Sequence, residues 1–248
     1  MNDAKALPAT PWDFKARALV FGIIYGLGFM AGINLQLSYY GNIQPTYALI
    51  GERFGLTGIH AAAFLPVFFT LSGYVLRVWG TAYLSSGVVW NANVSSGGLL
   101  LSGPYRYVRN PLYLGNLLVA VGIGLLGPPF SMLIIVVGVT AFVMRLISVE
   151  ERYLTAVYGQ AYHEYTRLVP RLIPRLTPAP IAIGPRPPAW SDGFWGETLH
   201  LAFVLATLYN ALFSWRQPST AMWVFLVVAL LFWGMIRRFI TGKSFATQ

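Results

Sequence analysis

The stretch that decides the fold runs from Pro111 to Glu151 and reads PLYLGNLLVAVGIGLLGPPFSMLIIVVGVTAFVMRLISVEE. Two apolar runs, Pro111–Leu126 and Phe130–Ile147, flank Gly127-Pro128-Pro129. A glycine followed by two prolines ends one helix and lets the next begin. With their flanks, the runs approach the roughly 20 residues needed to cross a membrane. We therefore predict an antiparallel hairpin whose two outer ends meet at one membrane surface.

The composition extends this interpretation to the whole chain. Of its 248 residues, 56% are hydrophobic and only 10% charged, whereas soluble domains are about one quarter charged. Four more apolar runs of similar length occur, at Ala18–Leu37, Ile59–Val78, Leu199–Trp215 and Ala221–Ile236. We predict an all-α fold, a single polytopic membrane bundle over residues 1–248 with about six transmembrane helices.

The distribution of basic residues predicts how this bundle is oriented. With six spans, only Arg53 and Arg216 fall opposite the termini, and the other 15 of the 17 lysines and arginines share the termini's side. Basic residues concentrate in cytoplasmic loops, so both termini are expected in the cytoplasm. The first run lacks a cleavage pattern and is expected to stay as a span. Topology and anionic lipid explain the basicity, so we expect the bilayer as partner and no nucleic acid.

Several kinds of chemistry are excluded by residue type. The chain has no cysteine, so it offers neither disulfides nor a thiolate nucleophile or metal ligand. Its three histidines, His60, His163 and His200, are too scattered to predict a metal site. GIGLLG at Gly122–Gly127 matches a dinucleotide motif in letters only, because no strand precedes it, so packing is expected there. The glycines of Gly22-xxx-Gly26 and Gly28-xxx-Gly32 are also expected to pack against helices.

The segments after the hairpin are expected to lie at the cytoplasmic surface. Apolar residues recur every four positions from Val149 to Tyr165, which predicts an amphipathic helix, with Gly159 a point of interruption. Seven prolines between Val169 and Trp190 predict an extended linker, either a lid or an interfacial connector. The expected units are a core at 97–175, a linker at 176–197 and an added helix pair at 198–240.

The hairpin's cytoplasmic mouth gathers unusual chemistry. The stretch GPYRYVRNPLYLG, Gly103 to Gly115, places arginines and tyrosines at the start of the hairpin's first helix. Glu150 and Glu151, two of only eight acidic residues, follow the apolar run of its second helix. Singly, the arginines can set topology, the tyrosines can form an aromatic belt, and Asn110 can cap a helix that starts at Pro111. Together they suit a zwitterionic ligand with a cationic centre, since arginine forks bind anions and tyrosine faces attract cations.

The order of GPYRYVRNPLYLG, EERYL and YGQAYHEYTRLVPRLIP resembles the isoprenylcysteine carboxyl methyltransferase and phospholipid methyltransferase superfamily. The resemblance covers about Leu99 to Pro174 and implies a membrane enzyme that uses S-adenosylmethionine to methylate a lipophilic or small thiol, carboxylate or amine. The positions that match the family's cofactor contacts are Leu99, Leu100, Tyr105, Asn110, Pro111, Leu112, Tyr113 and Glu150. Those that match motif or substrate-binding positions, and are expected to be catalytic, are Arg109, Arg145 and Glu151.

One departure and two alternatives accompany this resemblance. The family has histidine before the proline, and asparagine stands there, at Asn110, which cannot shuttle protons near neutral pH. We expect Asn110 to contact the cofactor instead. A membrane reductase similar to the sterol reductases, using a nicotinamide cofactor, is one alternative. A non-enzymatic transporter or scaffold is the other, disfavoured because the expected spans carry almost no buried charge. The methyl acceptor and the oligomeric state stay open.

Overall fold

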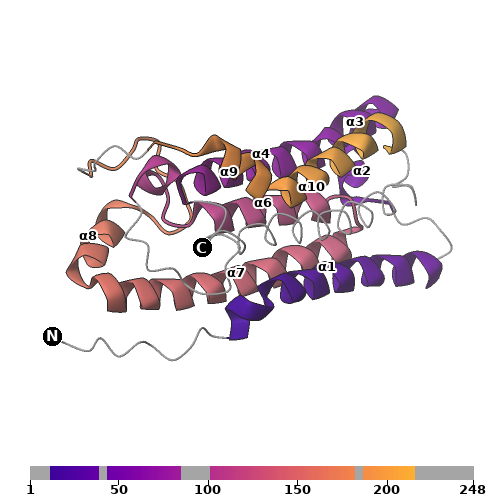
Figure 1. Cartoon of the computed structure of the whole chain (residues 1–248). Helices are drawn as coiled ribbons and strands as arrows, with labels where there is room; N and C mark the ends of the chain where they lie inside the picture. Colours follow the sequence, from indigo (N-terminus) through magenta and orange to yellow (C-terminus); the bar gives the residue numbers. More distant parts are fainter. Residues whose placement is uncertain (1–11, 39–43, 85–100, 182–186, 216–248) are drawn as a thin grey trace, which may run out of the picture.

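The computed structural model describes residues 12–38, 44–84, 101–181 and 187–215, and every regular element within these ranges is a helix. Five longer helices form an elongated bundle (Figure 1). They are α1 (Trp12–Ser38), α4 (Phe64–Leu84), α6 (Pro111–Gly124), α7 (Pro129–Tyr158) and α10 (Thr198–Tyr209). The all-α class is confirmed. Helical stretches Thr46–Leu84 and Pro129–Tyr158 are long and apolar enough to cross a membrane.

The described residues hold two helical stretches of spanning length, whereas the sequence predicts six spans. Three shorter apolar helical stretches accompany the two long ones, at Ala16–Ala31, Pro111–Gly124 and Thr198–Ser214. The sixth expected span, Ala221–Ile236, lies outside the described residues. Six transmembrane helices therefore stay a prediction.

The predicted hairpin is confirmed. Helix α6 ends at Gly124, Pro128 occupies the N-cap position of α7, and Pro129 opens that helix. The turn between them is held from outside, because both the backbone N and the Oγ1 of Thr46 lie 2.8 Å from the Gly127 carbonyl oxygen, to which they donate. The two ends of the hairpin therefore return to the same end of the bundle, where α8 lies in Figure 1.

The second expected span, Ile59–Val78, differs from the helices observed. Three short helices precede its main part: α2 (Thr46–Gly51), the 3-10 turn η1 (Glu52–Phe54) and α3 (Gly55–Ala62). The helix breaks at Ala63 before α4 begins. The physical reason is Pro66, which has no N–H to donate to residue 62 and is tolerated only in the first turn of a new helix.

Glycines set the distance between α4 and α6. A Cβ added at Gly73 would lie 2.6 Å from the Gly115 carbonyl oxygen, and one at Gly122 would lie 2.8 Å from that of Pro66. The packing role predicted for the GIGLLG glycines is thus borne out. In α1 the prediction is only partly right: Gly28 packs against Ile135, whereas Gly22 and Gly26 have no described neighbour within 4 Å.

The amphipathic helix predicted from Val149 onward forms with its break at Gly159, but only part of the predicted stripe, such as Tyr165, faces inward. Gly159, at φ +50°, separates α7 from α8 (Gln160–Leu168). Tyr162 and Tyr165 are buried, while Val157 on the predicted apolar stripe is exposed. The prediction assumed one continuous helix. The positive φ at Gly159 changes the direction of the chain, so residues before and after it no longer share one helical face.

The proline-rich segment folds back over the loop that precedes α6. Residues 170–181 form no helix, and 182–186 lie outside the described residues. Its backbone is paired with that loop: Arg109 N donates to Pro170 O at 2.9 Å, Arg175 N to Tyr107 O at 3.0 Å, and Ala179 N to Arg106 O at 2.9 Å. A short helix, α9 (Trp190–Gly196), and the π-helical turn η3 (Asn210–Ser214) flank α10.

Candidate functional site

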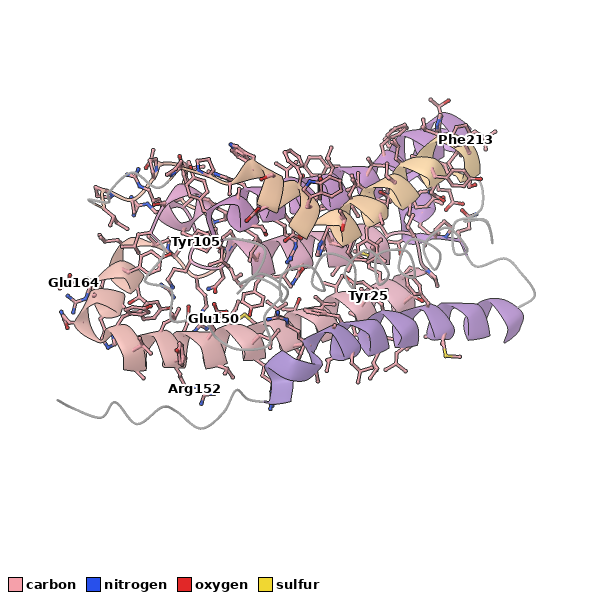
Figure 2. All side chains as sticks on the ribbon, in the orientation of Figure 1. Tyr25, Tyr105, Glu150, Arg152, Glu164 and Phe213 are labelled. Atoms are coloured by element: carbon pink, nitrogen blue, oxygen red, sulfur yellow. The ribbon has the colours of Figure 1, made fainter. Side chains whose placement is uncertain are left out.

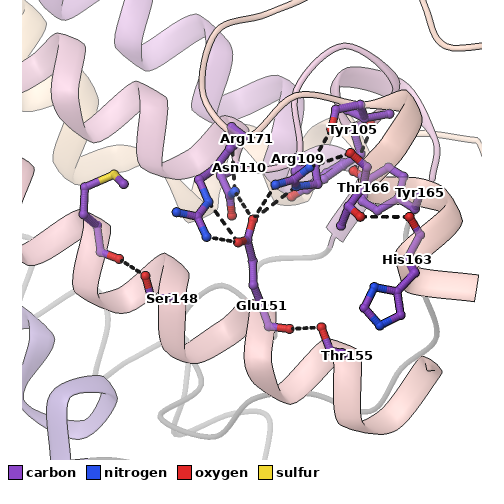
Figure 3. A network of polar contacts seen from close by, with 12 residues as sticks. Tyr105, Arg109, Asn110, Ser148, Glu151, Thr155, His163, Tyr165, Thr166 and Arg171 are labelled. Atoms are coloured by element: carbon purple, nitrogen blue, oxygen red, sulfur yellow. Dashed lines mark hydrogen bonds and ion pairs between the residues drawn. The ribbon is translucent and has the colours of Figure 1, made fainter. Parts of the chain in front are cut away.

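The two consecutive glutamates on α7 have different surroundings. The Glu151 carboxylate meets Arg109, Asn110 and Arg171 (Figure 3). The Glu150 carboxylate instead accepts a hydrogen bond from the Tyr113 hydroxyl on α6. Successive residues of an α-helix point about 100° apart, so adjacent carboxylates are directed into two separate environments. The predicted meeting of the two hairpin ends is confirmed by these contacts.

Glu151 anchors the loop before α6 to the segment after α8. Its Oε1 accepts a hydrogen bond from Arg109 Nε at 3.1 Å, and its Oε2 accepts one from Arg171 Nε at 2.9 Å. The Arg109 guanidinium also donates to the carbonyl oxygens of Thr166 at 3.0 Å and Val169 at 2.8 Å. The Arg109 and Glu151 side chains are each only 12% exposed. Both predicted catalytic residues are therefore held in a fixed cluster.

The same cluster occupies the Asn110 side chain. Asn110 stands at the N-cap of α6 with Pro111 at the first helical position, as predicted, but its side chain makes no capping hydrogen bond. Its Nδ2 instead donates to the Arg171 carbonyl oxygen at 3.1 Å and to Glu151 Oε1 at 3.4 Å. Asn110 thus bridges the helix start to the linker.

An open groove of about 600 Å³ lies beside this cluster. Its walls come from α7, α8, the loop before α6 and the segment after α8, and they carry three arginines against one carboxylate. The lining residues are Arg109, Ser148, Glu151, Arg152, Thr155, Tyr162, Thr166 and Arg171. The Glu151 hydrogen bond raises the pKa of Arg171 above its ordinary value, against the opposing effect of partial burial, so its positive charge is secure.

Tyr105 carries a buried hydroxyl without a partner in the described part of the chain. It lies on the 3-10 turn η2 (Gly103–Arg106) and is 8% exposed. Tyr165 Oη fixes its backbone by donating to the Tyr105 carbonyl oxygen at 2.8 Å. Burial, and next the charge of Glu150, raise the pKa of Tyr105 well above 10, so the phenol keeps its proton. An unpaired buried hydroxyl is costly, by about 1–3 kcal/mol.

Tyr105, Tyr113 and Glu150 therefore form a second polar group, distinct from the Glu151 cluster. Figure 2 labels Tyr105 and Glu150 near the α8 end of the bundle, one in the layer of η2 and the other on α7. The Glu150 carboxylate accepts a hydrogen bond from Tyr113 and interacts electrostatically with Tyr105, whose unpartnered hydroxyl can serve a ligand. An acidic group framed by aromatic rings is suited to a cation.

The remaining predicted residues are less informative. Pro111 and Leu112 lie in the first turn of α6, next to Asn110. Arg145 has an exposed side chain on α7 and does not line the groove. Leu99 and Leu100 lie outside the described residues. Across the described ranges, no group of three His, Asp or Glu side chains could hold a metal ion.

A buried ion pair was missed by the sequence reasoning, which expected almost no buried charge in the spans. Arg77 on α4 and Glu197, just before α10, have side chains 6% and 0% exposed, and Arg77 Nε lies 2.7 Å from Glu197 Oε2. Thr81 Oγ1 donates to Glu197 Oε1 at 2.6 Å, and His200 Nδ1 lies 2.7 Å from Oε2. Arg77 inside an apolar run was the available signal, since such a charge needs a partner.

Comparison with known proteins supports the predicted family. The sequence profile of the phospholipid methyltransferase family matches residues 61–161. The chain is 30% identical to the cobalt-zinc-cadmium resistance protein CzcN of Cupriavidus metallidurans over 142 residues, which are 54% of this chain and 62% of that protein. No solved structure matches the chain.

Two relatives with named activities match shorter segments. Protein-S-isoprenylcysteine O-methyltransferase of Schizosaccharomyces pombe is 38% identical over 77 residues, 31% of this chain and 33% of that protein. Methanethiol S-methyltransferase of Crocosphaera subtropica is 37% identical over 70 residues, 28% of this chain and 27% of that protein. The chain thus spans less than two thirds of the length of each of these relatives. Residues 61–161, which hold α4, α6 and α7, are therefore similar to the phospholipid methyltransferase family.

Proposed function

We propose that this protein transfers the methyl group of S-adenosylmethionine to a lipophilic or small acceptor at the cytoplasmic face of the membrane. The observation that carries the proposal is the buried, unpartnered hydroxyl of Tyr105 close to the Glu150 carboxylate. The cofactor's sulfonium and ammonium groups are cations, and its ribose and carboxylate offer hydrogen-bonding groups. Tyr105, Tyr113 and Glu150 fit such a molecule in charge and in hydrogen-bonding capacity.

The residues have separate tasks in this proposal. Glu150 attracts the cationic part of the cofactor, and the Tyr105 hydroxyl takes up a hydrogen bond that the fold leaves unmade. Asn110, Arg109 and Glu151 hold the first turn of α6 in place through their mutual contacts. When bound, the cofactor supplies an electrophilic methyl group on a positively charged sulfur. Alignment of that methyl with the acceptor supplies much of the acceleration, as holding reactants together generally does.

The geometry favours an acceptor that is already anionic. Asn110 replaces the family's histidine, and its amide is committed to Arg171 and Glu151. Both carboxylate oxygens of Glu151 already accept hydrogen bonds from guanidinium groups, those of Arg109 and Arg171. A carboxylate or a thiolate needs no proton removed, in contrast to an ammonium. The relatives named for methyl transfer to isoprenylcysteine and to methanethiol are consistent with these classes.

The proposal is tested by ligand binding to the full chain in detergent. S-adenosylmethionine or its demethylated product is expected to raise the melting temperature, whereas a reduced nicotinamide cofactor is not. Glu150→Gln should weaken cofactor binding about 10- to 100-fold, because a hydrogen bond to a charged group contributes about 1.5–3 kcal/mol. Glu164→Gln, the same change on the exposed face of α8, is the control and should bind as wild type.

Two outcomes would contradict the proposal. Wild-type protein that responds to the nicotinamide cofactor and not to S-adenosylmethionine would assign a reductase. Glu150→Gln protein that binds S-adenosylmethionine as tightly as wild type would remove that residue from the site.

A further inference from the structure

The buried ion pair of Arg77 and Glu197 also contacts α6, through the guanidinium nitrogen of Arg77 that does not bind Glu197. Arg77 uses Nε and Nη2 on the two Glu197 oxygens, at 2.7 and 3.0 Å. Its third nitrogen, Nη1, donates to the Leu112 carbonyl oxygen at 3.0 Å and to Asn116 Oδ1 at 2.8 Å. One guanidinium thus connects the segment before α10 with the first two turns of α6.

The side of α6 that Arg77 contacts is the start of the helix, where the site residues lie. Leu112 follows Asn110 and Pro111 and precedes Tyr113, whose hydroxyl donates to Glu150. A rigid planar guanidinium held by two carboxylate oxygens has a fixed orientation. The position of Glu197 therefore determines where Nη1 meets α6.

The surroundings leave this connection little freedom to shift. A Cβ at Gly115 would clash with the Arg77 side chain, and one at Gly80 would lie 2.9 Å from Leu112 Cδ2. On the other side, α9 is pressed against α4, since a Cβ at Gly193 would lie 2.6 Å from the Val78 carbonyl oxygen. Ala189 N donates to Ala82 O at 2.7 Å, which fixes the start of α9.

Glu197 lies outside residues 61–161, the segment that matches the family. We propose that Glu197, acting through Arg77, is a positioning residue for the Leu112–Tyr113 turn, so that the segment carrying α9 and α10 is a working part of the methyltransferase site. This inference rests on the proposed function only where its test measures binding of S-adenosylmethionine. It goes beyond that function because it gives the C-terminal helices a part in the site.

The test needs a variant that keeps the fold. Glu197→Gln alone strands a buried guanidinium charge, and breaking such a pair from one side costs about 3–5 kcal/mol. The double variant Arg77→Met/Glu197→Leu removes both charges, and apolar replacement of a buried pair is often neutral or stabilising. It also removes the contact on Leu112. Thr207→Val is the matched control, because Thr207 Oγ1 lies 2.9 Å from Thr70 Oγ1 and joins α10 to α4 away from the start of α6.

Two measurements then separate positioning from simple support. In titrations with S-adenosylmethionine, the double variant is expected to bind about tenfold more weakly than wild type, and Thr207→Val within twofold of it. By hydrogen exchange, the amides of residues 114–116 should exchange at least tenfold faster in the double variant, with little change at the amides of residues 67–75. Thr207→Val should leave the amides of 114–116 protected.

The outcomes distinguish the two proposals. A double variant that binds the cofactor like wild type, with unchanged exchange at 114–116, overturns the positioning role and leaves the proposed function standing. Wild-type protein that does not bind S-adenosylmethionine overturns the proposed function, while faster exchange at 114–116 in the double variant would still support positioning of the start of α6 by Glu197.

Discussion

At the scale of single residues, Glu197 is the most deeply buried acidic residue in the described part of the chain. Burial alone would raise its pKa, but Arg77 and then His200 outweigh burial and lower the pKa from 4.5 to about 2. A carboxyl group whose pKa is lower in the folded state stabilises the fold above its unfolded pKa. That stabilisation is lost as the pH falls from about 4.5 towards 2.

This gives a prediction for acid stability. The melting temperature of wild-type protein in detergent should fall between pH 4.5 and 2, as a contribution on the order of 3 kcal/mol is removed. Arg77→Met/Glu197→Leu lacks the carboxylate and should show a shallower fall, with Glu164→Gln as the control that follows wild type. Parallel curves for wild type and the double variant, measured by differential scanning fluorimetry, would show that the pair does not control acid stability.

The sequence predicts that arginines and glutamates meet at the cytoplasmic end of the hairpin, but it does not predict which partners each glutamate contacts. Rare acids after one helix and arginines before another, joined by a short turn, are enough to predict that Arg109 and Glu151 meet. Which glutamate faces which partners depends on the rotation of α7 and on Arg171, which returns from a linker 20 residues later. The partner of Arg77 lies 120 residues away, a separation at which local patterns carry no information.

At the scale of helices, the close contact between α4 and α6 depends on glycines, which have no side chain to keep the backbones apart. A methyl group at Gly73 would press on the Gly115 carbonyl oxygen at 2.6 Å and on Val119 Cγ2 at 2.8 Å. Overpacking of this kind costs about 1–3 kcal/mol when the backbone has to move. The two helices would have to separate.

We therefore expect Gly73→Ala to lower the melting temperature in detergent by several degrees. Gly26→Ala is the matched control: it also lies in an apolar helix, but no described atom approaches within 4 Å of the new methyl group. Alanine favours the helix over glycine by about 1 kcal/mol, so this control should be neutral or stabilising. If both variants melted alike, close packing at Gly73 would not be limiting.

Helices were predictable where the sequence carries strong punctuation. Gly127-Pro128-Pro129 fixes the hairpin, and Gly159 ends α7, because both act through backbone chemistry that needs no tertiary context. The short helices α2 and α3 were not predicted. The start of α2, at Thr46, is held by the turn after α6, a contact with a distant segment that local patterns do not reveal.

At the scale of the whole molecule, the two ends of the bundle are chemically different. The end with α8 carries the arginine-rich groove, while the end with α2 and α3 has an apolar hollow of about 520 Å³ lined by residues such as Phe54 and Leu65. The distribution of basic residues predicts that the α8 end faces the cytoplasm.

The absence of cysteine makes this orientation directly testable. Thr57→Cys and Thr177→Cys place one thiol at each end, both at exposed positions and without altering charge. In intact cells, a membrane-impermeant maleimide should label Thr57→Cys, while Thr177→Cys should require permeabilisation. The reverse pattern would place the termini outside and contradict a cytoplasmic site.

The distance in sequence between Arg77 and Glu197 has a consequence for biosynthesis. A ribosome adds about 5–20 residues per second, so Arg77 is made roughly 6–24 s before the acid that neutralises it. During that interval the nascent chain holds an uncompensated cation in an otherwise oily segment, which is a costly state in a bilayer. A chain that ends before Glu197 lacks the carboxylate that pairs with Arg77 in the complete fold, and we expect such truncated chains to be less stable.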